Sequence, residues 1–535
     1  EPERHEFDAT PPERDFYETY LPQFEAAVRQ GHVGAVMGAY NAVYGIPACA
    51  NPLLLTTLLR QDWGFTGHVV SDCGAIYDIY ANHKYAASSE AAAADAVKAG
   101  DDLCCGTDYN SLTRAVQQGL ISERQIDTAV GRLFQARFEL GLFDPPGAVP
   151  YSKISIAEND TPAHAALALK VAQESIVLLK NNGVLPLDRA KLKRIAVIGA
   201  NADSVPVLLG NYNGTPSHPV TILAGIRAAA GTNVAVVYAP GCPLALHRHA
   251  TNEVDMQAWT QAIEAATTAD VVIYVGGISP QLEGEEMKVD FDGFKGGDRT
   301  RIELPEPQPA LLKALQACGR PVVFVNCSGS AIAMPWAAEN LPAIVQAWYP
   351  GEAGGTAVAD VLFGMVNPAG RLPITFYDST TNLPPFEDYS MSNRTYRYFN
   401  GTPEYAFGYG LSYTTFAYRD ATLNQPAFTP KDTVKVSFTL QNSGARDGDE
   451  VAQVYFRHLH PPVPQPREAL CNFARIHLAA GQTAHITMQI PAERFRCWDT
   501  AQKQYVVEPG DYELMVGAAS DDIRLRVPLT ITATN

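Results

Sequence analysis

A carboxylate that could take part in catalysis stands at Asp72, in the apolar segment Val69 to Gly74. It ends a strand predicted over residues 67–72, which follows a helical pattern over 51–61. In β/α-barrel enzymes the reacting groups lie at the C-terminal tips of the strands. An aspartate in this position can also cap the helix that follows. The spacing alone leaves both interpretations open.

A second polar side chain stands at the end of the preceding predicted strand. Residues 34–40 form a short apolar run that ends at Tyr40. Since consecutive parallel strands present their C-terminal ends at one edge, Tyr40 and Asp72 would face the same pocket. Met37, inside the run, could line that pocket. A core position is the alternative for both Tyr40 and Met37.

Further carboxylates are concentrated in the segment Leu282 to Met287, which contains Glu283, Glu285 and Glu286. This segment follows a predicted strand over 270–276 and lies in a loop rich in Gly, Asp and Lys. A long loop can bring such a group to a site formed by distant residues. A solvated acidic loop is the alternative.

The elements that would position Asp72 form a β/α alternation over residues 1–150. Predicted helices and strands follow one another along this range: 11–30, 34–40, 51–61, 67–72, 88–99, 101–105, 111–119 and 122–141. They supply about three β/α units, whereas a (β/α)8 barrel needs eight. We therefore expect the C-terminal part of a TIM-like barrel, with open strand edges and an uncovered apolar face. Its N-terminal half could be a separate polypeptide or could be missing from the given sequence, and chain 1–535 expressed alone is expected to be inactive and poorly folded.

Two more domains are expected downstream, so that the fold class is multidomain α/β. A linker over 151–172 leads into an α/β sandwich domain over 173–377, whose strands are apolar throughout and suit a sheet covered on both faces. An extended connection over 378–415 follows. Residues 416–535 show short alternating strands and predict a β-sandwich.

Composition excludes several classes of function. With 46% hydrophobic and 18% charged residues the chain is globular. Its net charge of −17 would repel nucleic acid and fits a neutral ligand such as a sugar. No apolar run is long enough to cross a bilayer, so no membrane partner is expected. The nine cysteines show no zinc spacing, and neither a metal nor an organic cofactor is expected.

An ordered set of motifs resembles glycoside hydrolase family 3. The matching segments run through the whole chain: Met37 to Asn41, Ala48 to Pro52, Trp63 to Asp72, Gly141 to Asp144, Asn367 to Pro373 and Phe407 to Tyr413. The resemblance implies a retaining mechanism with two carboxyl groups, and a fibronectin-type-III-like identity for the C-terminal β-sandwich. It makes Asp72 the nucleophile.

The resemblance also assigns the acid/base and the residues that hold the sugar. Gly284-Glu285 aligns best with the family's Gly-Glu-Gly-aromatic motif, so Glu285 is the expected acid/base and Glu283 the second candidate. The chain departs from that motif, because Glu286 and Met287 stand where Gly and an aromatic residue are usual. The family's Lys-His pair that grips the sugar is expected just before Glu1, outside the given residues.

Four further residues complete the expected site: Arg4, which resembles the family arginine that holds sugar hydroxyls, with Tyr40, Met37 and Cys73. Cys73 follows the nucleophile where many β-glucosidases of the family carry Trp, so it resembles the β-xylosidase and α-arabinofuranosidase branch. Resemblance to that branch also implies a disulfide between Cys73 and Cys105.

These features together predict an exo-acting β-D-xylosidase that acts on oligosaccharides in xylan degradation. A β-glucosidase is the alternative within the family, and α-arabinofuranosidase activity stays open. A non-catalytic carbohydrate-binding or scaffold fragment is the alternative from another class. A periplasmic or secreted location is inferred from the class, and a homo-oligomer is not excluded.

Overall fold

The computed structural model describes residues 1–249 and 254–533, which form two compact units. The first unit comprises residues 1–159 together with 385–390 and 498–504. The second comprises 160–384, 391–497 and 505–535. Within the described residues, no helix is both long and apolar enough to cross a membrane.

The first unit is a partial, barrel-like β/α domain. Its strands β2 (Ala35–Gly38) and β5 (His68–Ser71) pair in parallel. The strand expected over 101–105 is reduced to one bridge between Val70 and Leu103. The regular ladder stops there, because the hydroxyl of Ser71, and not a backbone carbonyl, accepts the N–H of Cys105 at 3.0 Å. A small sheet in the order β1-β3-β4 lies in the same unit, formed by Asp8–Ala9, Ala42–Val43 and Ile46–Pro47.

Helices follow these strands much as the periodicity predicts. They are α1 (Glu13–Asp15), η1 (Phe16–Tyr20), α2 (Pro22–Arg29), η3 (Leu53–Asp62), α3 (Ala75–Ala81), α4 (Ser89–Ala99), α5 (Leu112–Gln117) and α6 (Glu123–Glu139). Ser88 caps α4 by accepting the N–H of Ala91, and Gly100 ends it with a φ of 114°. A capping box of Ser122 and Gln125 begins α6. The single helix expected over 11–30 is divided into α1, η1 and α2.

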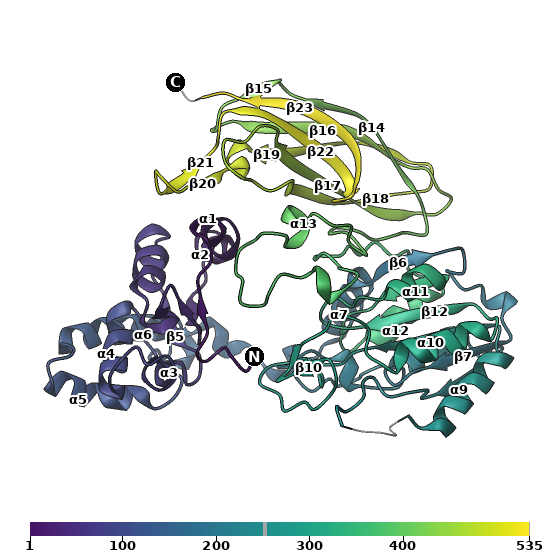
Figure 1. The fold of residues 1–535 in the computed structure, drawn as a ribbon, viewed down its shortest axis with the longest axis horizontal. Helices are drawn as coiled ribbons and strands as arrows, with labels where there is room; N and C mark the ends of the chain where they lie inside the picture. Colours follow the sequence, from purple (N-terminus) through teal and green to yellow (C-terminus); the bar gives the residue numbers. More distant parts are fainter. Residues whose placement is uncertain (250–253, 534–535) are drawn as a thin grey trace. The chain divides into compact units, whose positions relative to one another are not determined.

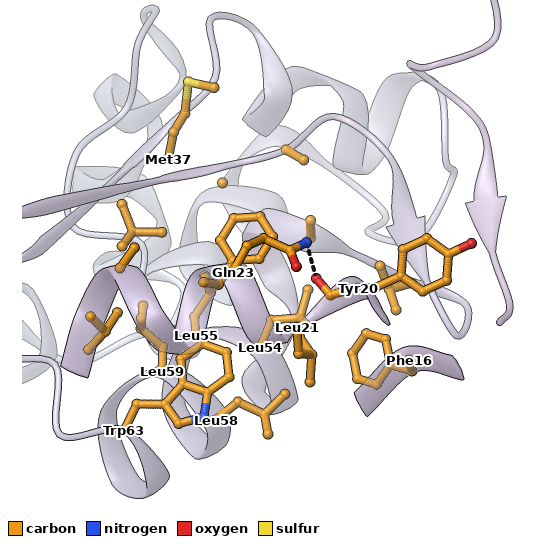
Figure 2. Close-up of a pocket in the computed structure, with 18 of the residues that line it drawn as sticks. Phe16, Tyr20, Leu21, Gln23, Met37, Leu54, Leu55, Leu58, Leu59 and Trp63 are labelled. Atoms are coloured by element: carbon orange, nitrogen blue, oxygen red, sulfur yellow. Dashed lines mark hydrogen bonds between the residues drawn. The ribbon is translucent and has the colours of Figure 1, made fainter. Parts of the chain in front are cut away.

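An apolar hollow of about 630 Å³ opens beside β2 in the first unit. Figure 2 shows leucines of η3 and aromatic side chains, among them Phe16 and Trp63, around it. Met37 also lines it and is 60% exposed. An apolar face of the barrel-like domain is therefore open in this structure, as the sequence predicts. None of the described residues that line the hollow is an acid, so it is not a candidate for hydrolytic chemistry.

The second unit begins with a six-stranded sheet in the order β6-β13-β12-β9-β7-β8, parallel except for β6 (Figure 1). Its strands are β6 (Val177–Asn181), β7 (Arg194–Ile198), β8 (Ala235–Ala239), β9 (Val271–Gly277), β12 (Val322–Cys327) and β13 (Ala343–Gln346). Two separate cores cover its faces. One involves α7 (Pro162–Ser175), α8 (Ile222–Ala230) and α12 (Gly354–Leu362). The other involves α9 (Met256–Thr268), α10 (Gln308–Ala317) and α11 (Pro335–Asn340).

The same unit ends in a β-sandwich of two sheets, in the orders β14-β16-β19 and β15-β23-β22-β17-β18. The strands are β14 (Phe416–Leu423), β15 (Ala427–Phe428), β16 (Thr433–Asn442), β17 (Gly448–His458), β18 (Ala469–Leu478), β19 (Thr483–Pro491), β22 (Gly510–Ala519) and β23 (Asp522–Ile531). Alternate residues of β16, such as Val434, Val436 and Phe438, are buried between the sheets. The predicted fold class, a partial barrel, an α/β sandwich and a fibronectin-III-like domain, is confirmed.

Candidate active site

Asp72 lies directly after β5, in the first unit. Its backbone N–H donates to the carbonyl of Gly38 at the end of β2, at 2.8 Å. Its Oδ1 accepts the N–H of Cys73 at 2.7 Å. The helix that follows, α3, begins after Gly74 and has no side-chain cap. Asp72 therefore does not have the capping role that its position also allowed, and its Oδ2 makes no hydrogen bond within the described residues.

Tyr40 and Cys73 flank this carboxylate. The hydroxyl of Tyr40 donates to the backbone carbonyl of Cys73 at 2.9 Å, which ties the ends of the two strands together. Cys73 is exposed and forms a disulfide with Cys105, with 4.4 Å between the Cα atoms. The residue after Asp72 is thus held from two sides, by a hydrogen bond and by a covalent link.

Arg4 belongs to the same group of side chains. Its guanidinium lies 4.6 Å from the centre of the Tyr40 ring, and its Nη1 forms an ion pair with Glu1 at 2.8 Å. Arginine presents several directed N–H donors to neighbouring oxygens. The structure thus links Arg4 to Tyr40, and Tyr40 to Cys73, the residue that follows Asp72. Met37 differs, because it lines the apolar hollow.

Three residues that the sequence did not single out for the site also contact Tyr40 or its neighbours. The rings of His5 and Tyr40 meet edge-on, with 4.6 Å between their centres. The Nδ1 of His5 lies 2.7 Å from Oδ2 of Asp78, which is buried. The Nε2 of His83 lies 2.8 Å from the Tyr40 carbonyl oxygen. No local pattern in the sequence marks these three residues as partners of this group.

A buried acid lies behind the strand end that carries this group. A methyl group added to Gly38 would come within 2.7 Å of Cys49 Sγ and 3.4 Å of Asp101 Oδ2. Asp101 is fully buried; Cys49, Tyr109 and the Leu103 N–H lie near its carboxyl group, but none of them makes a hydrogen bond of good geometry with it. Burial raises the pKa of Asp101 to about 8. Asp102 is also buried, but it is paired with Arg60 and Arg132 at 2.7 and 2.8 Å.

Asp101→Asn is expected to flatten the dependence of stability on pH. Between pH 4 and 8 an unfolded Asp101 ionises while the folded one keeps its proton, so the wild type loses stability as pH rises. Asparagine does not ionise. The variant should gain at most about 4 kcal/mol relative to the wild type between pH 5 and 8.

Urea unfolding at the two pH values measures this gain. Asp102→Asn is the matched control and should destabilise at both, because it leaves two arginines with one fewer charge partner. Parallel pH profiles for Asp101→Asn and the wild type would show that Asp101 is ionised in the folded chain.

The acidic segment lies in the second unit, in the loop after β9. A close backbone approach fixes this loop, since a side chain on Gly297 would meet the Gly284 carbonyl oxygen at 1.8 Å. The N–H of Gly284 donates to the carbonyl of Gly297 at 3.2 Å. Only glycine at position 297, which also has a φ of 100°, permits this contact. The loop is thereby anchored directly beside the carboxylates.

Glu283 is fully engaged by its neighbours. Its Oε1 accepts the N–H of Gly329 and the hydroxyl of Tyr349, both at 2.7 Å, and its Oε2 accepts the hydroxyl of Ser330 at 2.6 Å. Burial lowers the pKa of the Arg299 guanidinium, and the negative charge of Glu283 acts against this shift. Glu283 thus has the contacts of a residue that holds the loop.

Glu285 lies two residues further along the same loop. It is partly exposed and accepts a hydrogen bond from the hydroxyl of Tyr212, a side chain that is 90% exposed. Glu286, which follows, has a φ of 49°. Of the two candidate acid/base residues, Glu283 is the one that three groups of its own unit hold through hydrogen bonds. Across the described residues, no three side chains of the kinds that bind metal ions gather in one place.

Comparison with known families gives three consecutive matches. The model of the glycosyl hydrolase family 3 N-terminal domain matches residues 3–136, and that of the C-terminal domain matches 176–413. A fibronectin type III-like domain matches 450–520. The first match contains Asp72 and the second contains Glu283 and Glu285.

Individual relatives cover nearly the whole chain. A xylan 1,4-beta-xylosidase of Xylanibacter ruminicola is 37% identical over 97% of this chain and 76% of its own length. A periplasmic beta-glucosidase of Salmonella typhimurium is 34% identical over 95% of this chain and 69% of its own length. A solved exo-beta-xylosidase in complex with a xylobiose aziridine probe superposes with a TM-score of 0.90 at 31% identity, covering 99% of this chain and 69% of that one.

Proposed function

Because the chain belongs to glycosyl hydrolase family 3, whose members similar to it include β-xylosidases and β-glucosidases, we propose that it is a retaining exo-β-glycosidase that releases xylose from the non-reducing end of oligosaccharides. The observation that carries this proposal is the position of Asp72. Asp72 stands at a strand end of the barrel-like domain, and its Oδ2 makes no hydrogen bond within the described residues. The next residue, Cys73, is held by a disulfide.

The contacts of Asp72 suggest which of its atoms attacks. Oδ1 is fixed by the N–H of Cys73, so we assign the attack on the anomeric carbon to Oδ2. The bond from that carbon to the leaving oxygen breaks as the ester forms, and the leaving oxygen takes the proton of Glu285. Glu285 then removes a proton from water, which attacks the ester and frees Asp72. Two inversions retain the β configuration.

We assign the acid/base role to Glu285 and not to Glu283, because the carboxylate of Glu283 already stabilises the loop through hydrogen bonds. Both oxygens of Glu283 accept hydrogen bonds from groups of its own unit, which favour the charged carboxylate. A proton donor must instead be able to take up and release its proton, and we assign this role to Glu285, which stands in the Gly284-Glu285 pair that resembles the family motif.

Arg4, Tyr40 and Cys73 are assigned to sugar binding. The Arg4 guanidinium can donate to neighbouring sugar hydroxyls, while Tyr40 supports it through the face of its ring. Cys73 and its disulfide to Cys105 would form a pocket wall much smaller than a tryptophan. A periplasmic or secreted location stays a prediction, and so does the proposal that no cofactor is required.

Aryl glycoside hydrolysis tests the specificity. We expect kcat/KM for nitrophenyl β-xyloside to exceed that for the glucoside about 10- to 200-fold, the range that one hydroxymethyl group supports. A preference for the glucoside would favour the β-glucosidase alternative. If folded full-length protein binds xylooligosaccharides and hydrolyses no glycoside, the non-catalytic alternative would be correct.

A further inference from the structure

A second hollow, of about 460 Å³, lies inside the second unit, and none of the described residues that line it has a role assigned above. It is bounded by the segment from Tyr396 to Phe407 and by strands β17, β22 and β23 of the β-sandwich. Its volume is within the range of small-molecule sites, about 300–1,000 Å³. In contrast to the apolar hollow of the first unit, it is lined by charged side chains.

The charges around this hollow balance. The hollow is lined by three arginines, Arg457, Arg467 and Arg526, and by two acids, Glu468 and Asp521. Arg457 and Arg526 share the carboxylate of Glu513, at 2.9 and 2.7 Å. Three arginines thus face three acids, so no large charge of one sign is left for an ionic ligand, and the site suits a neutral one.

Several of these polar groups are left without a partner. Glu468 has no side-chain hydrogen bond or ion pair among the described residues, and the Asp521 carboxylate accepts a hydrogen bond from its own backbone N–H. The hydroxyl of Thr375 and the Nε of Arg457 are buried and have no hydrogen-bond partner there either. Buried polar groups in native proteins are nearly always paired, with water or a ligand where protein groups are absent. The hollow therefore offers both donors and acceptors.

The surroundings of Glu468 add to this picture. Burial raises its pKa to about 7, against the opposing charges of Arg467, Arg526 and Arg457. A carboxyl group poised in this way can either accept or donate a hydrogen bond near neutral pH. The stacked rings of Tyr396 and Phe407, 4.2 Å apart, supply apolar surface at the edge of the hollow.

We propose that this hollow is an accessory binding site for one or two units of a neutral sugar. Vicinal hydroxyl groups donate to carboxylates and accept from guanidinium groups at once, which matches the mixture of Glu468, Asp521 and the three arginines. A C–H face of the ring would pack against the aromatic edge. This goes beyond the proposed hydrolytic site, and its test requires no turnover.

Calorimetric titration of xylose and xylobiose into full-length Asp72→Asn protein tests the proposal. Arg467→Ala/Glu468→Gln should remove one binding site, and Glu468→Gln alone, which keeps the shape of the side chain, should weaken that site at least tenfold. Arg419→Ala/Asp420→Asn is the matched control, since it removes an adjacent Arg–acid pair on an exposed strand of the same β-sandwich. It should change neither the number of sites nor the affinity.

Unchanged binding in both pocket variants would overturn the accessory site, as would the absence of any site that responds to them in the starting protein. Hydrolysis of nitrophenyl β-xyloside by proteins with intact Asp72 separates the two proposals. If the pocket variants bind and hydrolyse as the wild type does, only the accessory site is refuted. If no variant and no wild type hydrolyses a glycoside, only the proposed function is refuted.

Discussion

Asp72→Asn is expected to lower kcat on nitrophenyl β-xyloside about a thousandfold or more. The amide has the size of the carboxylate and can keep the hydrogen bond from the N–H of Cys73, so the local structure should persist. It cannot, however, form the sugar ester on which a retaining mechanism depends. Initial rates of the purified full-length variant and wild type measure the loss.

Asp62→Asn is the matched control for this experiment. Asp62 is an exposed aspartate at the end of η3 in the same unit, and its replacement should leave kcat unchanged. Thermal unfolding of both variants checks that the fold is intact. If Asp72→Asn retained a tenth of the wild-type rate or more, another residue would be the nucleophile.

Glu285→Ala is expected to slow hydrolysis about 10²- to 10⁴-fold for substrates with poor leaving groups, the usual contribution of a general acid/base. Substrates with good leaving groups need no proton and should form the ester almost normally. Azide, an anion that attacks without base assistance, should then restore turnover and give a β-glycosyl azide. Rates with and without azide, and identification of the product, measure this result.

Glu283→Ala provides the matched comparison. It removes the acceptor for the N–H of Gly329 and for the hydroxyls of Ser330 and Tyr349, and so should lower stability. Azide should not restore its activity. Rescue of Glu283→Ala but not of Glu285→Ala would reverse the assignment of the acid/base.

Much of the fold could be predicted because the apolar patterns are unambiguous where a strand is covered on both faces. Residues 271–275 are apolar throughout and form the buried strand β9. The sequence does not reveal the strand β6, because the alanine-rich apolar pattern over residues 163–178 continues into it without a break. In the structure α7 ends at Ser175 and β6 begins two residues later, antiparallel to β13. Periodicity cannot locate such a boundary, since apolar residues suit both elements.

The candidate site could be predicted only where a strand end marks it. Asp72 and Tyr40 follow apolar runs, and that local signal is visible in the sequence. The contact of His5 with Asp78 joins residues 73 positions apart, which no local pattern indicates. The buried Asp101 likewise looks the same in the sequence as its paired neighbour Asp102. The engagement of Glu283 depends on residues more than 40 positions away.

Trapping of the covalent intermediate tests the central claim most directly. A 2-deoxy-2-fluoro-β-xyloside with a good leaving group should label the full-length protein once, because the fluorine slows breakdown of the ester more than its formation. Peptide mass spectrometry is predicted to find one fluoroxylosyl group on Asp72 and none in Asp72→Asn. A label on any other carboxylate, or release of product with inverted configuration and no label, would contradict the mechanism.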